Sequence, residues 1–197
     1  MSQINIRPLA SAIVDNRQCR LLKSQTELVE YERALYREFT RKNPHNWLCR
    51  NYLLIEGDRY RSPIPYSAQS IYGINQKSKL ISAVAINFDT DNQMQFEAVG
   101  FNLELELTNC NYCEVLTFFI GQDKHHNYFK IIEHLKQVVI TDLKARNIAF
   151  GLANCTKNLL PLYLRMGWSV VDRKMLENKT KYLIKFEILP NRRSQYK

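Results

Sequence analysis

The sequence predicts an α/β fold in which a mixed, mostly antiparallel sheet carries helices on both faces. One observation is an amphipathic helical pattern early in the chain, followed by short apolar segments of strand length. A second is a long helical pattern that separates two strongly apolar strands. A third is composition, because 45% apolar residues in a chain of 197 supply one core of ordinary size. This order is typical of a single domain over residues 1–197.

In the first half of the chain a helix is followed by a long connection and then by a hairpin. Apolar residues at helical spacing predict a helix over residues 24–42. Several prolines and a glycine predict an irregular surface insert over residues 43–70, and loops of that length are often functional. A hairpin is then expected with strands over 71–74 and 80–88, and a further strand is expected between residues 93 and 107.

The second half contains the most regular patterns. The stretch CEVLTFFI, residues 113–120, is the most apolar strand, and a long helix is expected over 128–146. A buried strand over 148–154 comes next, followed by a short helix that ends at Gly167 and by two strands expected at the edge of the sheet. Residues 190–197 form a basic tail.

The charge balance limits the kinds of partner. Lys and Arg total 28 against 19 Asp and Glu, which gives a formal charge of +9 and favours a polyanionic partner. The basic residues are scattered and not interleaved with aromatic residues along a stripe, so nucleic-acid binding is not favoured.

The cysteines and histidines indicate neither a disulfide framework nor a metal site. Five cysteines without a regular pattern, and no apolar N-terminal stretch, predict a reduced, cytoplasmic protein with no membrane span. Cys110 and Cys113 form a CxxC that lacks a second ligand pair. His125 and His126 are adjacent and therefore point in different directions, so no metal is expected there.

Three features of the second half resemble the GNAT superfamily of N-acyltransferases. The stretch YLRMGW, Tyr163 to Trp168, is similar to the family's tyrosine, three residues, glycine and aromatic residue. Strand 113–120 is similar to the family strand in which some members carry a catalytic glutamate, here Glu114, and the elements between the two landmarks follow the family's order. The resemblance implies a GNAT-like transferase, for example an N-acetyltransferase, that moves an acyl group from a pantetheine thioester to a small-molecule amine by direct attack.

The resemblance implies catalytic roles for two residues. Glu114, if buried, would have a raised pKa and could accept a proton from the attacking ammonium group. Tyr163 would protonate the departing thiolate or donate a hydrogen bond to it. The alternatives are that Glu114 is a solvated residue at a strand end and that Tyr163 belongs to an apolar helical stripe.

The same resemblance places the thioester arm between two splayed parallel strands, 113–120 and 148–154. The residues expected to contact the donor are Phe118, Phe119, Ile120, Lys124, His125, His126, Asn127, Tyr128, Asn154 and Asn158. Strict alternation would put Glu114, Leu116, Phe118 and Ile120 on one face of their strand and Val115, Thr117 and Phe119 on the other. Asn154 and Asn158 could instead cap the helix expected to begin near Thr156.

The sequence departs from the family at the loop that normally binds pyrophosphate. Aligned by the helix that follows, the family's loop positions fall on Asp123, His126 and Tyr128, without the glycines that let backbone approach phosphate. Two kinds of acyl donor are compatible with a loop that lacks these glycines. One is acyl-CoA, such as acetyl-CoA, held by Lys124 and the two histidines; the other is the phosphopantetheine arm of an acidic acyl carrier protein, which the +9 charge would attract.

The long insert and the weak phosphate loop resemble the branch that includes acyl-homoserine lactone synthases and N-acyl amino acid synthases. Thr117 stands where that branch tends to have an arginine. A GNAT-like domain that has lost catalysis and serves as a binding or regulatory module is the alternative function.

Overall fold

The computed structural model describes residues 13–14, 17–42, 46–76, 79–90, 94–103, 107, 110–121, 128–176 and 178–189. Its elements, in chain order, are β1 (Ile13–Val14), β2 (Arg17–Leu21), α1 (Gln25–Lys42), α2 (Trp47–Asn51), β3 (Leu53–Ile55), β4 (Arg59–Arg61), the 3-10 helix η1 (Tyr66–Ala68), β5 (Gln69–Gln76), β6 (Lys79–Asn87), α3 (Gln95–Ala98), β7 (Tyr112–Ile120), α5 (Tyr128–Ala145), β8 (Phe150–Thr156), α6 (Leu160–Arg165), β9 (Ser169–Leu176) and β10 (Lys179–Glu187).

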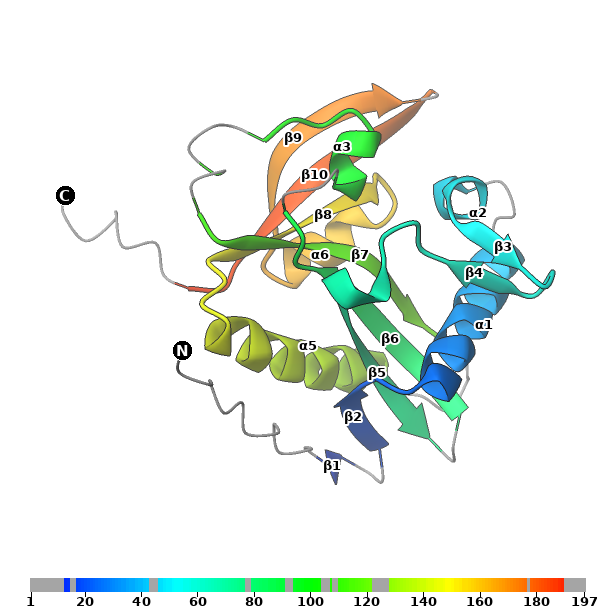
Figure 1. Ribbon diagram of the computed structural model, residues 1–197. Helices are drawn as coiled ribbons and strands as arrows, with labels where there is room; N and C mark the ends of the chain where they lie inside the picture. The colour runs from blue at the N-terminus through cyan, green and yellow to red at the C-terminus, as the bar shows by residue number, and fades with distance from the viewer. Residues whose placement is uncertain are drawn as a thin grey trace, which may run out of the picture.

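One eight-stranded sheet forms the centre of the molecule, in the order β1-β2-β5-β6-β7-β8-β10-β9 (Figure 1). Among the described strands of this sheet, only β7 and β8 run parallel to each other. β10 was expected at an edge, but it lies between β8 and β9. The predicted mixed, mostly antiparallel sheet is confirmed.

Helices cover both faces of this sheet (Figure 1). On one face α5 buries Ile131 and Leu135 against β5 and β6, because its apolar residues recur at helical spacing. On the other face α1 buries Tyr31 and Leu35 in a second cluster that includes Phe119 of β7. None of the helices in the described ranges combines the length and the apolar character that a membrane crossing needs.

The described part of the insert, residues 46–70, is largely regular, which corrects the expectation of an irregular excursion. It contains α2, the β3–β4 hairpin and η1. Glu32 of α1, which is 1% exposed, accepts hydrogen bonds from Arg61 Nε at 2.6 Å and from the Tyr66 hydroxyl at 2.7 Å. Arg59 Nη1 lies 3.6 Å from the same carboxylate. A buried charge cluster therefore holds the hairpin on α1.

A strand was expected between residues 93 and 107. For the described residues of that range this prediction is wrong, because they contain the short helix α3. Phe96 of this helix and its neighbours Met94, Val99 and Phe101 enter a third apolar cluster with residues of β7, β8 and β10. The amide groups at the start of α3 are bound by a carboxylate from β7, a tertiary contact that a local sequence pattern does not reveal.

Strand β7 does not keep strict alternation. Its ladder with β6 shifts register and leaves Leu116 as an extra residue, which is a β-bulge. Val115 and Phe118 therefore both face α5, whereas Leu116 and Phe119 both pack on the α1 face. The expectation that Glu114, Leu116 and Phe118 share one face is wrong, because the bulge turns the strand between them.

Candidate active site

A wedge opens between the parallel strands β7 and β8. Their ladder contains three residue pairs and ends at Glu114↔Leu152. Both strands continue beyond that pair, β7 to Ile120 and β8 to Thr156, without further pairing to each other. Beyond Glu114 and Leu152, the backbone groups on the facing edges of β7 and β8 are thus not paired with each other in any described ladder. This agrees with the predicted splay of the two strands.

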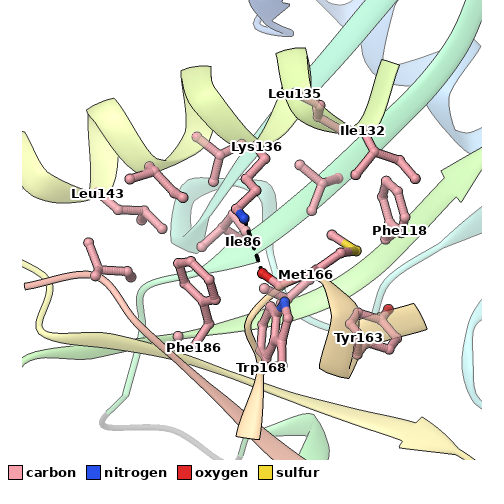
Figure 2. Close-up of a pocket in the computed structure, with 16 residues that line it drawn as sticks. Ile86, Phe118, Ile132, Leu135, Lys136, Leu143, Tyr163, Met166, Trp168 and Phe186 are labelled. Atoms are coloured by element: carbon pink, nitrogen blue, oxygen red, sulfur yellow. Dashed lines mark hydrogen bonds between the residues drawn. The ribbon is translucent and has the colours of Figure 1, made fainter. Parts of the chain in front are cut away.

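An apolar cavity of about 80 Å³ lies on the α5 face of the sheet, beside the start of this wedge (Figure 2). Its described lining residues are Val84, Ile86, Val115, Phe118, Ile132, Leu135, Lys136, Val139, Ile140, Leu143, Gly151, Tyr163, Met166, Trp168, Phe186 and Ile188. Val115 and Gly151 adjoin the last paired residues of β7 and β8. The cavity therefore offers apolar space to a hydrocarbon chain held in the wedge.

Tyr163 of α6 lies in the wall of the cavity, and its ring and that of Trp168 form a T-shaped pair at 5.6 Å between centroids. Burial raises the pKa of the Tyr163 phenol above its ordinary value, and the nearby Cys155 thiol acts in the same direction. The phenol therefore stays protonated at neutral pH and can only donate or accept a hydrogen bond.

The end of α6 explains the spacing of tyrosine, glycine and tryptophan. Gly167 has φ +90°, which glycine adopts without a Cβ clash. Its N–H donates to Leu164 O at 3.0 Å, and the Trp168 N–H donates to Tyr163 O at 3.1 Å. These two bonds form a Schellman motif, in which the residue after the glycine packs on the residue five positions earlier. The motif fixes the backbone of Tyr163.

Glu114 lies at the end of the β7–β8 ladder and is 0% exposed. One carboxylate oxygen accepts the Gln95 N–H at 2.8 Å and the other accepts the Phe96 N–H at 2.7 Å. Burial raises its pKa to about 7, although these two amides act in the opposite direction. The alternative of a solvated strand-end residue is therefore wrong, and the carboxylate holds the start of α3.

This raised pKa gives a prediction for stability. The folded-state pKa of about 7 lies above the ordinary value of 4.5, so the folded protein binds the proton more tightly than the unfolded chain. The stabilisation from the bound proton is present at low pH and is lost as the pH rises toward 7. Between pH 5 and 8 the free energy of unfolding of the wild type should fall by about 3 kcal/mol relative to Glu114→Gln. Urea unfolding of both proteins across this range measures it, and a pH-independent difference would contradict the raised pKa.

A groove lies on the opposite face of the sheet from the cavity. Its described lining comes from α2, the loop between β4 and η1, the end of β6 and the residues just after it, and the start of α3. These residues are Trp47, Asn51, Pro63, Ile64, Pro65, Asn87, Asp89, Met94, Gln95 and Ala98. The Gln95 side chain connects two neighbours, because its Nε2 donates to Leu116 O at 3.1 Å and its Oε1 accepts from the Tyr52 hydroxyl at 3.2 Å. The bulge of β7 is thus tied to the groove wall.

The residues of β7 that were predicted to contact the donor lie on two different faces of the sheet. Phe118 lines the cavity and Ile120 packs on the same side. Phe119 is buried on the other face, where its ring stacks on Tyr31 at 6.4 Å between centroids. Only the backbone of Phe119 can therefore face the wedge.

Asn154 and Asn158, which were also predicted to contact the donor, lie in different surroundings. Alternation along β8 places Asn154 on the α3 face with Leu152, and its Nδ2 is enclosed without a hydrogen-bond partner among the described residues. Asn158 is exposed in the turn before α6. Neither is the N-cap residue of α6, which is Leu159, so the capping alternative is wrong.

The predicted phosphate contacts at Lys124, His125, His126 and Asn127 lie outside the described residues. Tyr128, the first residue of α5, is exposed. Sequence reasoning missed Gln95 and Lys136. The spacing of Ile132, Lys136 and Val139 on one helix could have indicated that the lysine borders the buried face, whereas no local pattern indicated Gln95.

The wedge between two parallel strands, with a tyrosine from the following helix beside it, is the arrangement of the GNAT N-acyltransferase fold. No protein-family model matches the sequence, and no curated protein matches it. Solved structures do match. FeeM, an N-acyl amino acid synthase from uncultured soil microbes, aligns with a TM-score of 0.64 at 14% identity over 91% of this chain and 95% of its own.

Two acyl-homoserine lactone synthases are similarly related. The AHL synthase LasI aligns with a TM-score of 0.70 at 11% identity, over 91% of this chain and 92% of its own. BjaI, a CoA-dependent acyl-homoserine lactone synthase solved with SAM and isopentyl-CoA, aligns with a TM-score of 0.63 at 15% identity, over 83% of this chain and 76% of its own. The predicted GNAT-like fold, and its likeness to this branch, are confirmed.

Proposed function

We propose that the protein is an N-acyltransferase that moves an acyl group from a pantetheine thioester to an amine by direct attack. The observation that carries the proposal is the apolar cavity at the point where β7 and β8 part, with the phenol of Tyr163 in its wall. The fold likeness to FeeM, LasI and BjaI, which are synthases of acylated products, supports the same class of reaction.

The donor is an acyl-CoA or an acylated carrier protein whose pantetheine arm lies in the wedge. The amide groups of the arm would pair with backbone of β7 and β8, and the enclosed Nδ2 of Asn154 would donate to a carbonyl of the arm or of the acceptor. The cavity favours a hydrocarbon acyl chain longer than acetyl, because each buried methylene contributes about 0.8 kcal/mol. The formal charge of +9 supports an acidic carrier protein as donor.

The amine acceptor approaches from the groove on the other face. Among its described lining residues the groove has one carboxylate, Asp89, and no lysine or arginine, which suits an ammonium group. The groove and the cavity lie on opposite faces of the wedge. The thioester carbonyl would therefore sit between them, with the acyl chain on one side and the amine on the other.

In the reaction the neutral amine nitrogen attacks the thioester carbonyl carbon, a C–N bond forms and the C–S bond breaks. The leaving thiolate is stabilised by a hydrogen bond from Tyr163. A full proton transfer is disfavoured, because the raised pKa of this phenol exceeds the pKa of a thiol, about 8.5. The thiolate is then protonated from solvent, which also receives the proton released by the amine.

The described cysteines near the wedge do not favour a covalent intermediate. Burial raises the pKa of Cys155 to about 11 and that of Cys113 to about 12. Both side chains therefore remain thiols at neutral pH, and a thiol is a weak nucleophile. This supports direct attack by the amine.

Glu114 takes a supporting role in this proposal. Direct proton abstraction would require the amine to reach an oxygen that is fully enclosed and already accepts a backbone amide. The carboxylate instead fixes α3, and with it the Gln95 side chain in the wall of the groove.

The test is a donor screen. Purified protein is incubated with acetyl-CoA, medium-chain and long-chain acyl-CoA, and the matching acyl carrier proteins, together with a pool of amines, and N-acylated products are measured by mass spectrometry. A product from an acyl donor longer than acetyl supports the proposal. Binding of a donor by calorimetry without any product would favour the alternative of an inactive binding module, and no binding of any donor would overturn both.

A further inference from the structure

Lys136 is the one charged side chain among the described residues that line the apolar cavity. It extends from α5 toward the end of α6 (Figure 2). In this view Phe118 and Tyr163 lie on one side of the lysine, and Leu143 and Phe186 lie on the other. Lys136 is half-buried, and its place among these apolar side chains needs an explanation, because removing even part of a charge from water is costly.

Two contacts hold the ammonium group. Lys136 Nζ donates to the carbonyl oxygen of Met166 at 3.0 Å, and it lies 5.1 Å from the centroid of the Phe186 ring. Met166 is the C-cap residue of α6, so the ammonium satisfies a carbonyl at a helix end and complements the helix dipole. This contact stabilises α6, but an arginine or a solvated lysine could do the same from outside the cavity.

We propose that the hydrogen bond from Lys136 to Met166 is a crossbar that divides the cavity and sets the maximum length of the acyl chain. The proposal rests on the proposed function. An acyl chain entering on the Tyr163 side would reach the ammonium group before the space beside Leu143. Passing it would place methylene groups against the charge and displace contacts that methylene groups cannot replace.

The space beyond the crossbar suits a longer chain. Leu143, Val139 and Ile140 of α5 line the same cavity and are apolar. The barrier is therefore one of charge and hydrogen bonding, because the far side would otherwise accept hydrocarbon. Lys136→Met keeps a side chain of similar length and removes the ammonium group, so it should open the far side.

The experiment measures chain length in two independent ways. Saturated fatty acids from butyrate to palmitate displace a fluorescent fatty acid from the protein, and the donor screen is repeated with the matching thioesters. In Lys136→Met the optimum should move to longer chains, with kcat/KM for the next longer donors rising about tenfold, as expected for about two further buried methylene groups. Lys136→Arg should keep the wild-type profile. Lys144→Met removes an exposed lysine from the same helix outside the cavity and should change nothing.

The outcomes separate the inference from the proposed function. Turnover in both proteins with the same chain-length profile would overturn the crossbar and leave the acyltransferase intact. No displacement and no turnover by any chain length in the wild type would overturn both. If Lys136→Met is unfolded in a thermal scan, Lys136→Gln keeps a hydrogen-bond donor without the charge, and its profile must shift in the same direction for the inference to stand.

Discussion

Replacing Tyr163 by phenylalanine is expected to lower kcat about 100-fold, with KM for the acyl donor changed less than about threefold. The hydroxyl is the only polar group of this ring, and its hydrogen bond to the sulfur strengthens as negative charge develops on the thiolate. The substitution keeps the ring, so the edge contact with Trp168 and the Schellman motif at Gly167 should remain. Steady-state kinetics with the best donor of the screen measures both constants.

Tyr182→Phe is the matched control for this prediction. Tyr182 packs in the same cluster as Tyr163, but it is not among the described residues that line the cavity. Removal of its hydroxyl should leave kcat within about twofold, as expected for a hydroxyl outside the cavity. Equal rates for Tyr163→Phe and the wild type would remove the tyrosine from the mechanism, and equal losses in both variants would indicate a structural effect.

Adding Gly151→Leu to the Lys136→Met variant is expected to cancel its gain of about tenfold in kcat/KM for longer donors, because the leucine would fill the space beside Phe186, the strand partner of Gly151, on the far side of the lysine. A Cβ at this position would lie 3.7 Å from Cys113 Sγ and 3.9 Å from Ile188 Cδ1, which are ordinary contacts. The backbone therefore tolerates a side chain, and the additional carbons must enter the space between β7, β8 and α5.

Gly151→Ala is the control, since its methyl group makes only those contacts and leaves the cavity open. In the Lys136→Met background it should keep the preference for longer donors. Thermal unfolding of both variants shows whether overpacking, which typically costs about 1–3 kcal/mol, has unfolded the leucine variant. If the double variant is folded and keeps the gain for longer donors, the acyl chain of those donors does not lie beside Gly151.

The fold could be predicted largely because its main signals are local. The two long helices and the apolar strands have periodicities of about 3.6 and 2 residues, which depend only on neighbouring residues. The insert and α3 could not be predicted in this way. Their regular structure depends on two buried carboxylates. The partners of Glu32 lie 29 and 34 residues away in the chain, and those of Glu114 lie 19 and 18 residues away.

The candidate site was predicted in part for the same reason. The motif from Tyr163 to Trp168 is contiguous, and its glycine is required by a backbone angle, so the motif can be recognised from the sequence alone. The faces of β7 were predicted wrongly, because the bulge at Leu116 arises from pairing with β6. Lys136 was missed, since its partner Met166 is 30 residues away.

The sequence by itself thus determined the two long helices, the apolar strands of the sheet, the end of α6 and the placement of Tyr163 on it. These features follow from local periodicity and from the backbone freedom of Gly167. Only the tertiary structure decided that β7 and β8 part after Glu114, that a cavity lies beside the gap, and that a lysine from α5 lines this cavity and donates to the end of α6. Those features depend on strand register and on packing between distant segments, which no local pattern encodes.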